Sequence, residues 1–483
     1  MKLKISSISD PEEGLKWTLV HVVLGFVASY SVYAFIAYFY IVVYQNYKDS
    51  LQQFKSGNIE LVTMLVSYLM GFELLNRVAK GSPFIPVEFS KYLCFFFFGY
   101  LAFLRREKMH PIGLALLVMA LPGAFYDLSD QVIWPDIVNN YMSPVGLAIG
   151  VGIWGSIKPT SELITDTMRL IWFGCVAVLV CIIIRTPSYN DLNMGLSAST
   201  ETSGGTSSNQ ASTILGLGMF LSFYSFFGGH KFSGKRVLDI VFMMAFALQG
   251  LLTFSRGGIM VAVIAIVFLI LFPSGSKNQE SGKKNKSGNF AKNILFISLG
   301  AGFLFLAFLL VDNLTGGKLT LRYQGETAGT AAGYAEKDLD KITSGRSDVF
   351  LYDVEIWLEH PLFGVGSGAS PYFRVEKEGV WIAPHVELSR LLADQGVLGL
   401  IYFILLLILG VLIFINRKKV PQSDLLMALY IIALATSFHA AMRTFVTPLF
   451  MTLSAMTLSP QLKSKPEAKE RKEEQEEEVS NTY

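Results

Sequence analysis

The chain has 483 residues, of which 52% are hydrophobic and 16% charged, and its formal net charge at neutral pH is +2. Soluble domains carry about a quarter charged residues, so this composition excludes an ordinary water-soluble protein and indicates an integral membrane protein. The small net charge leaves the nature of any partner open.

Apolar runs near the ~20 residues needed to cross a bilayer recur along the whole chain. They are continuous and lack strict polar alternation, which predicts helices rather than barrel strands. We therefore expect an all-α polytopic bundle of about 12 or 13 transmembrane helices. The expected spans are 17–44, 59–76, 86–104, 111–126, 141–157, 168–185, 211–229, 237–254, 257–273, 293–312, 395–415, 422–440 and 444–460.

Basic residues cluster in short loops between these spans, and the positive-inside rule assigns such loops to the cytoplasm. Counting spans outward from these clusters places four other connecting segments on the opposite face. One of them is a long polar loop, 313–394. An even number of spans would put the N-terminus inside. The basic clusters are 105–108, 231–236, 283–286 and 417–419; the segments opposite them are 186–210, the turn at Ser255, 313–394 and the turn near His439.

These features divide the chain into five parts. The tail mixes Lys and Arg with Glu, which predicts a disordered cytoplasmic end. The three cysteines lie in apolar spans and show neither a disulfide framework nor metal-ligand spacing. The parts are N-terminal helices 1–236, core helices 237–312, the large loop 313–394, C-terminal helices 395–460 and the tail 461–483.

Arg256 stands in the run Ser255-Arg256-Gly257-Gly258, which joins two spans almost without a loop. A guanidinium at a membrane boundary is costly unless it is solvated or paired. It could be a snorkelling interfacial arginine, which is the favoured reading of this residue alone. It could also be a phosphate ligand, with the glycines allowing an anion close approach.

Residues 346–359 are expected to form a helix that Ser344 caps and Pro361 ends. Apolar residues at helical spacing predict that it is amphipathic and lies on the surface of the bundle. These residues are Phe350, Val354, Trp357 and Leu358.

Arg346 falls in the first turn of this helix, where a cation opposes the helix dipole. The placement makes sense if the arginine and the helix N-terminus together receive an anion. A salt bridge from Arg346 to Asp348 or Asp353 is an equally open alternative.

The glycine-rich run 364–368 follows Pro361. Since no strand precedes it, we interpret the run as a tight turn that returns the loop to the membrane, not as a dinucleotide loop. Asp338 and Asp340 have the spacing of a metal motif but lie in an alternating-charge run typical of a solvated surface. We therefore expect no metal, and arginine must neutralise any phosphate.

His385 follows Pro384, and proline at a first helical position predicts a helix start on the loop side of the membrane. The helix dipole and nearby arginines would lower the pKa of His385, whereas Glu387 would raise it. A neutral imidazole could accept a proton from a hydroxyl. A capping or hydrogen-bonding histidine is the alternative.

Taken in order, these motifs resemble the O-antigen ligase and O-antigen polymerase superfamily. The resemblance covers about residues 240 to 415, and the first half of the chain agrees only in being a series of helices. It rests on Ser255-Arg256-Gly257-Gly258, Gly345-Arg346 with Trp357 eleven residues on, Pro361-Leu362-Phe363-Gly364-Val365-Gly366, His385, and Asp394-Gln395-Gly396-Val397-Leu398-Gly399.

The resemblance implies an inverting, metal-independent membrane glycosyltransferase of the GT-C type, without a cofactor. Such enzymes take a glycan from undecaprenyl pyrophosphate at the periplasmic face of the bacterial inner membrane. A ligase passes the glycan to a hydroxyl of lipid A-core, and a polymerase passes it to another lipid-linked repeat unit.

Carried over by position, Arg256 and Arg346 would hold the donor pyrophosphate, and His385 would activate the acceptor hydroxyl. One departure is that Val386 and Glu387 follow His385, where many relatives have Asn and an aromatic residue. Four further residues are candidates for substrate binding: Arg322, Arg390, Trp357 and Glu387.

Two alternatives stay open beside the preferred ligase. Within the superfamily, the motifs also fit a polymerase or a protein O-oligosaccharyltransferase. From another class, a lipid-linked polysaccharide transporter would place charged residues at mid-membrane. Glu73, Arg77 and Arg443 are the hints of such an arrangement, although all three lie near span ends.

Overall fold

The computed structural model describes residues 3–105, 109–188, 195–272, 286–338, 343, 345–379, 381, 386–417 and 420–459. Within these ranges every regular element is a helix, and one isolated antiparallel bridge joins Asp127 to Gly366. The expected all-α bundle is confirmed for this part of the chain.

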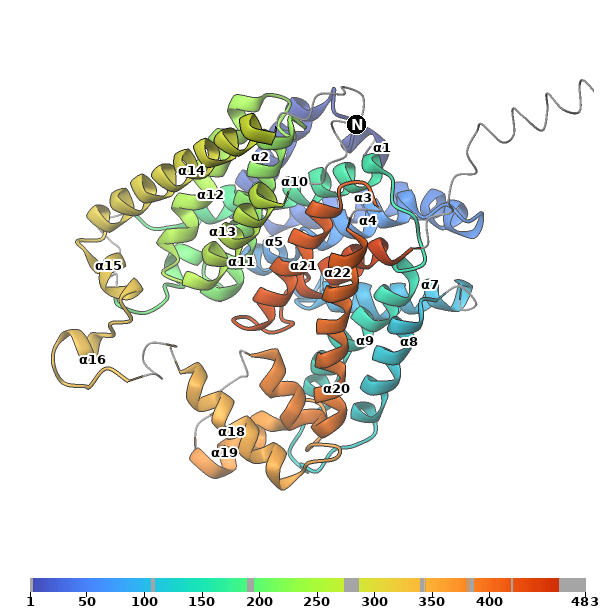
Figure 1. The fold of residues 1–483 in the computed structure, drawn as a ribbon, viewed down its shortest axis with the longest axis vertical. Coiled ribbons are helices and arrows are strands. Elements are labelled where there is room, and N and C mark those ends of the chain that lie inside the picture. Colours follow the sequence, from blue (N-terminus) through green and yellow to red (C-terminus); the bar gives the residue numbers. More distant parts are fainter. Residues whose placement is uncertain are drawn as a thin grey trace, which may run out of the picture.

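The first half of the chain is a series of helices packed side by side (Figure 1). A π-helical turn, Leu93–Phe97, joins α6 to α7, and 3₁₀ turns follow α8 (Leu121–Ala124) and precede α11 (Glu201–Ser203). The helices are α1 Ile5–Ile8, α2 Gly14–Tyr30, α3 Val32–Lys55, α4 Glu60–Met70, α5 Glu73–Ala79, α6 Phe89–Tyr92, α7 Phe98–Arg105, α8 Pro111–Ala120, α9 Trp134–Trp154, α10 Ser161–Arg185 and α11 Ser208–Gly228.

The second half continues the bundle and adds short helices at one end of it, where α18 and α19 lie below α20 in Figure 1. Its helices are α12 Arg236–Leu252, α13 Arg256–Leu271, α14 Lys286–Leu314, α15 Lys318–Tyr323, α16 Ala328–Ala331, α18 Arg346–Glu359, α19 Ser370–Glu378, α20 Glu387–Asn416, α21 Ser423–Ser437 and α22 Val446–Ser454, with a final 3₁₀ turn Ala455–Leu458.

Four helical segments of the described chain are long and apolar enough to cross a membrane, and seven apolar helices of 10–17 residues accompany them. This arrangement and the composition indicate a multi-pass membrane protein. The four long segments are Glu60–Ala79, Ser161–Arg185, Ser208–Gly228 and Glu387–Asn416.

The first expected span, 17–44, is two helices, so the prediction of a single long span was wrong. Ser31 has an extended backbone (φ −142°, ψ 113°) and separates α2 from α3. The two helices fold back on each other, because the rings of His21 and Tyr38 lie 6.0 Å apart. One polar residue within an apolar run changes the mean hydropathy too little to mark the end of a helix.

Glycines bring the central helices close enough for backbone contact. A Cβ added to Gly174 of α10 would lie 2.8 Å from the carbonyl oxygen of Gly71. One added to Gly216 of α11 would lie 2.3 Å from the carbonyl oxygen of Gly258 in α13. Close packing through small residues is how membrane helices associate without a hydrophobic driving force. It fixes α13, which carries Arg256, against α11.

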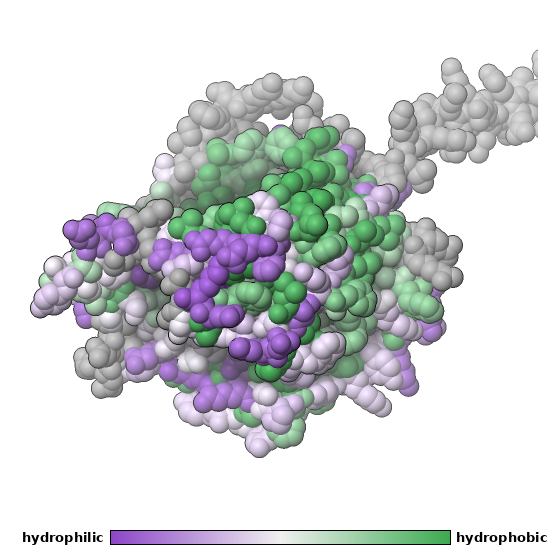
Figure 2. Space-filling model, turned by 90° about the horizontal axis from the view of Figure 1, so that it is seen from below, coloured by the Kyte–Doolittle hydropathy of each residue, from purple (hydrophilic) through white to green (hydrophobic). Residues whose placement is uncertain are grey.

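The polar segments expected on one face do lie together. Gln249 Nε2 donates to the carbonyl oxygen of Thr202 at 2.8 Å, which joins the segment before α11 to the end of α12. Arg322 Nε donates to the carbonyl oxygen of Phe254 at 3.4 Å, which joins α15 to the turn before α13. We call this end, which also carries α18 and α19, the loop face. Seen from this side, hydrophilic residues gather at its centre with hydrophobic surface beside them (Figure 2).

Described residues in or next to two of the basic turns, Gly234 and Gln422, lie at the opposite end of the bundle. Gln422 Nε2 donates to Thr165 Oγ1 at 2.8 Å. A Cβ added to Gly14 would lie 2.8 Å from the backbone nitrogen of Gly234. The N-terminal segment therefore lies next to Gly234, and the start of α10 lies next to Gln422, at this end of the bundle.

Candidate functional site

Three arginines that the sequence singled out lie within electrostatic range of one another on the loop face. Arg256 is the first residue of α13, Arg322 lies in the last turn of α15, and Arg346 is the first residue of α18. Burial, and then the charges of Arg256 and Arg346, lower the pKa of Arg322 to about 10. Burial and the charge of Arg256 also lower the pKa of Arg346. We call these three residues the arginine cluster.

Gathering like charges in a partly buried place costs free energy, and an anionic ligand would offset part of that cost. Such costly clusters concentrate at functional sites. Arginine binds phosphate oxygens in a bidentate manner and stays charged under all ordinary conditions. The cluster is therefore suited to an anion with several phosphate oxygens.

Arg346 sits at the start of α18, whose bounds Arg346–Glu359 confirm the predicted helix. The expected cap, Ser344, lies outside the described residues. The residue before the helix is Gly345, in the left-handed conformation (φ 81°), and Thr343 Oγ1 accepts the N–H of Ser347 in the first turn at 3.3 Å. Arg346 Nη1 donates to the carbonyl oxygen of Thr343 at 3.1 Å.

The predicted apolar face of α18 was only partly right. The side chains that the helix buries are Val349, Asp353 and Ile356, whereas Leu358 is 66% exposed. Asp353 is buried because it forms an ion pair with Arg374 of α19. Spacing alone could not reveal a charged residue on the buried face.

The alternative in which Arg346 pairs with Asp353 is therefore contradicted. Asp353 is fully buried, pairs with Arg374 and accepts a hydrogen bond from Ser389 Oγ at 2.7 Å. Burial raises the pKa of Asp353 to about 6, while Arg374 and Ser389 oppose that rise. This pair joins α18, α19 and α20 into one unit.

The glycines after Arg256, which one of the two readings of that residue assigned to the approach of an anion, pack against neighbouring segments. A Cβ on Gly258 would lie 2.0 Å from the carbonyl oxygen of Ser212 in α11. A Cβ on Gly257 would lie 2.6 Å from the ring of His439. The space beside each glycine is therefore already occupied.

Arg390 and Glu387 belong to a buried ion-pair network at the start of α20. Arg390 pairs with Glu387 one turn before it and with Asp394 one turn after it, the latter at 3.2 Å. Arg390 Nη1 also donates to the carbonyl oxygen of Asn140 at 3.4 Å. Arg390 is 3% exposed and both carboxylates are fully buried. The substrate contact predicted for Arg390 and Glu387 would require this network to open.

The glycine-rich run is a tight turn, as predicted. Gly364, Gly366 and Gly368 all have positive φ (71°, 103° and 82°), which glycine adopts without strain. The carboxylate of Asp394 accepts the N–H of Gly368 at 3.1 Å, and its backbone carbonyl accepts the N–H of Gly366 at 3.0 Å. The turn is thereby fastened to α20.

Trp357 fixes the end of α18 rather than lying free. Its Nε1 donates to the carbonyl oxygen of Pro361 at 3.3 Å, and its ring is half-buried.

His385 and Asp340 lie outside the described residues. Asp338 is exposed, and the described residues contain no group of three or more metal-ligating side chains.

For two features of the loop face, the sequence predicted a place in the chain but no part in this site. The first is His439. The second is a network around Arg77, which pairs with Glu73 at 2.6 Å and Glu88 at 3.2 Å and donates to the carbonyl oxygen of Arg443 at 3.2 Å. The i, i+4 spacing of Glu73 and Arg77 was the available signal. These charged side chains pair with one another. A transporter would instead need charged residues that line a path at mid-membrane.

Residues 240–404 match the family model described as O-antigen ligase. This part of the chain is similar to O-antigen ligases. The match runs from α12 into α20 and includes the arginine cluster and the glycine turn, so the resemblance seen in the motifs is confirmed. Comparison with curated proteins finds no match.

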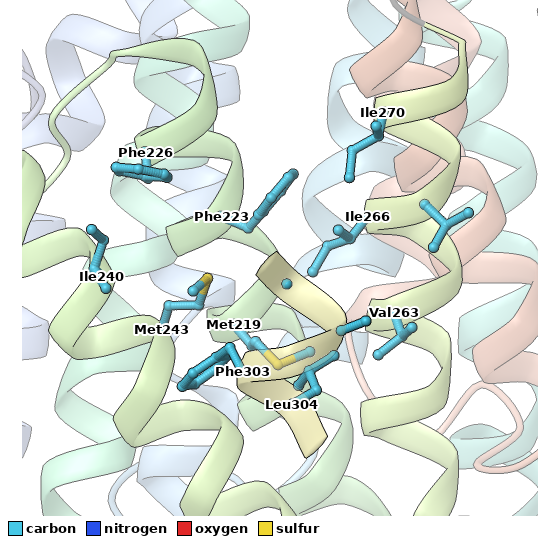
Figure 3. Close-up of a pocket in the computed structure, with 13 residues that line it drawn as sticks. Met219, Phe223, Phe226, Ile240, Met243, Val263, Ile266, Ile270, Phe303 and Leu304 are labelled. Carbon is cyan, nitrogen blue, oxygen red and sulfur yellow. The ribbon is translucent and has the colours of Figure 1, made fainter. Parts of the chain in front are cut away.

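Two adjoining apolar cavities lie between α11, α12, α13 and α14, and Figure 3 shows the residues that line the larger one. The larger has a volume of about 530 Å³ and the smaller about 280 Å³, and both are lined by Val263 and Leu304. We call them together the apolar groove. The larger is also lined by Met219, Phe223, Phe226, Ile240, Met243, Ile266, Val267, Ile270, Gly300, Ala301 and Phe303, and the smaller by Leu251, Ile259, Met260, Ile264, Phe308 and Tyr323.

The apolar groove ends beside the arginine cluster. Tyr323, which lines its smaller part, directly follows Arg322 in α15. The charge of Arg256 acts on the Tyr323 hydroxyl, although burial is the larger effect and raises its pKa to about 12. A long apolar channel thus leads to a cationic end.

Proposed function

We propose that this protein is a membrane glycosyltransferase of the O-antigen ligase type that moves a glycan from undecaprenyl pyrophosphate to an acceptor hydroxyl of lipid A-core. We place it in the bacterial inner membrane with the loop face toward the periplasm. The reaction is of the inverting, metal-independent GT-C kind.

The observation that carries this proposal is the position of the arginine cluster at the end of the apolar groove. A polyprenyl pyrophosphate has the same polarity pattern, with a long apolar chain and a doubly phosphorylated head. Each buried CH₂ group contributes about 0.8 kcal/mol to binding. The phosphates would be held by Arg256, Arg322 and Arg346 while the chain lies along Val263 and Leu304.

In the proposed reaction, the acceptor oxygen forms a bond to the anomeric carbon as the bond from that carbon to the pyrophosphate oxygen breaks. The electrons of the broken bond leave with the pyrophosphate, whose negative charge the arginines stabilise. The hydroxyl proton passes to the imidazole of His385. The products are the glycosylated acceptor and undecaprenyl pyrophosphate.

A polymerase of the same superfamily is the second candidate, because the arginine cluster and the groove would serve either acceptor. We prefer the ligase on the description of the matching family. A ligase and a polymerase can be distinguished by the polysaccharide that cells make when they lack this protein. Loss of all lipid A-linked polymer indicates a ligase, and a product with a single repeat unit indicates a polymerase.

The test uses the purified full-length protein in proteoliposomes with an undecaprenyl-pyrophosphate-linked oligosaccharide and lipid A-core. Arg256→Ala and Arg346→Ala should each lower the transfer rate about 100- to 1,000-fold, the usual cost of removing one donor to a charge that develops in the transition state. Lys at either position should restore only part of the rate, because an ammonium lacks the bidentate fork.

The control is Lys377→Ala, which removes a solvent-exposed ion pair with Glu359 and should leave transfer unchanged. EDTA should also leave the wild-type rate unchanged. Full activity in both arginine variants would refute the proposal. Activity that is lost with EDTA and restored by Mg²⁺ would refute the metal-independent mechanism.

A further inference from the structure

We propose that His439 is a further ligand of the donor pyrophosphate, acting beside Arg256. This inference rests on the proposed function. His439 lies outside residues 240–404, and no sequence motif marked it for this role. Three independent features of the loop face support it.

The first feature is the position of the imidazole. A Cβ added to Gly257 would lie 2.6 Å from Cγ, 2.8 Å from Nδ1 and 2.9 Å from Cδ2 of His439. The ring therefore rests on the backbone of α13, one residue after Arg256. The side chain of His439 is 7% exposed, so the ring is buried next to the residue that follows Arg256.

The second feature is the way the turn that carries His439 is held. The N–H of Met442 donates to Glu387 Oε2 at 3.1 Å, and the N–H of Phe445 donates to Glu73 Oε2 at 2.6 Å. Both carboxylates are buried. Burying a carboxylate to hold a backbone turn is costly unless every charge is compensated. Arg390 and Arg77 supply that compensation.

The third feature is the backbone of this turn. Ala441 has a positive φ of 50°, a conformation that costs a residue with a Cβ about 1 kcal/mol or more. Strain of this kind persists where the surroundings impose it, and it concentrates at functional sites. Together with the two buried carboxylates, it indicates that the position of the turn matters for more than folding.

The chemistry of the imidazole fits an anion held by the arginine cluster. A ring N–H donates a hydrogen bond to a phosphoryl oxygen in either neutral tautomer or in the charged form. The donor would approach from the side of α13. The acceptor would approach His385, which precedes α20 in the chain. His439 would thus bind the leaving group, and the role of His385 toward the acceptor would be unaffected.

The test measures binding of undecaprenyl pyrophosphate without a glycan to the full-length protein in nanodiscs. His439→Phe keeps the packing on Gly257 but removes the donor, and it should weaken binding about 10- to 100-fold, which corresponds to the ~1.5–3 kcal/mol of a hydrogen bond to a charged group. His439→Gln should retain more affinity than His439→Phe. Binding of undecaprenol, which lacks phosphate, should be unchanged in both variants.

Two further variants separate this inference from the proposed function. His230→Phe alters a histidine that stacks on Tyr224, next to the basic turn at 231–236, and should bind like the wild type. Arg256→Gln should weaken binding whether or not His439 contributes. If Arg256→Gln weakens binding and His439→Phe does not, His439 only packs and the inference fails. If neither variant weakens binding, the proposed pyrophosphate site fails with it.

Discussion

The carboxylate of Asp394 accepts the backbone N–H of Gly368 at 3.1 Å, which fastens the glycine turn to the first turns of α20. The same carboxylate pairs with Arg390, and Arg390 pairs with Glu387. This buried network therefore fixes the position of the glycine turn relative to α20. It also joins residues 364–368 to residues 394–396, which lie apart in the sequence.

Breaking this network should destabilise the protein strongly. Arg390→Met leaves the carboxylates of Glu387 and Asp394 buried without their cation, and removing one partner of a buried pair costs about 3–5 kcal/mol. Thermal unfolding in detergent measures the loss. Lys377→Met, which breaks an exposed pair with Glu359, should cost no more than about 1 kcal/mol. Equal losses in the two variants would contradict the role given to the network.

Much of the fold was predictable because hydropathy reports burial in a membrane directly. The helix Arg346–Glu359 was found from its spacing and the proline after it. The break at Ser31 was not, since one polar residue in an apolar run is compatible with a continuous helix. The buried Asp353 was not found either, because its partner Arg374 lies on a different helix.

The candidate site was predictable residue by residue but not as an assembly. The resemblance made Arg256 and Arg346 ligands of one pyrophosphate, but no local pattern showed that α15 brings Arg322 within range of both. Arg390 and Glu387 were assigned to substrate because their mutual pairing was not apparent. Contacts between distant segments depend on tertiary packing, which a single sequence does not encode locally.

The arginine cluster should make the unliganded wild-type protein less stable than a variant that lacks one of the three arginines. The pKa of Arg346 is lowered by burial and by Arg256, so at neutral pH, far below that pKa, the folded state carries the full cost of the charge. Arg346→Gln should therefore raise the unfolding free energy of the unliganded protein by up to about 1 kcal/mol, discounted for its partial exposure.

The same variant should lose the stabilisation that undecaprenyl pyrophosphate gives the wild type. Thermal unfolding with and without this lipid measures both effects, and Arg346→Lys, which keeps the charge, is the matched control. A clear fall in the stability of unliganded Arg346→Gln would show that Arg346 supports the fold instead of a ligand.

A bulky residue where the two cavities meet should interfere with long donor chains. Val263 lines both parts of the apolar groove, so Val263→Trp should lower the transfer rate from an undecaprenyl donor more than from a donor with a short isoprenoid chain. Val241→Trp, at a position 51% exposed on α12 and outside the groove lining, is the control. Equal effects on both donors would place the chain elsewhere.

The orientation in the membrane can be tested by labelling engineered cysteines with an impermeant maleimide in cells with a permeabilised outer membrane. Gly205→Cys, Thr330→Cys and Glu378→Cys should react, and Asn285→Cys and Lys418→Cys should not. The three native cysteines are buried and give no background. Reaction at position 285 with protection at position 330 would reverse the proposed orientation.

The sharpest prediction concerns His385 as the base that accepts the acceptor's proton. A sugar hydroxyl is a poor nucleophile until its proton leaves, and positioned base catalysis contributes about 10²–10⁴-fold. His385→Ala should lose activity by that factor, while donor binding, which the arginines provide, should change little. The wild-type rate should fall on acidification, because the imidazole can act as a base only while it is unprotonated.

His385→Gln decides between a base and a positioning residue, since glutamine keeps a hydrogen bond but cannot take the proton. We expect it to be as slow as His385→Ala and to lack the acidic limb of the pH–rate profile that an imidazole base imposes. Near-wild-type turnover with an unchanged profile would mean that His385 only orients the acceptor. The proton would then have to pass to another group on the loop face.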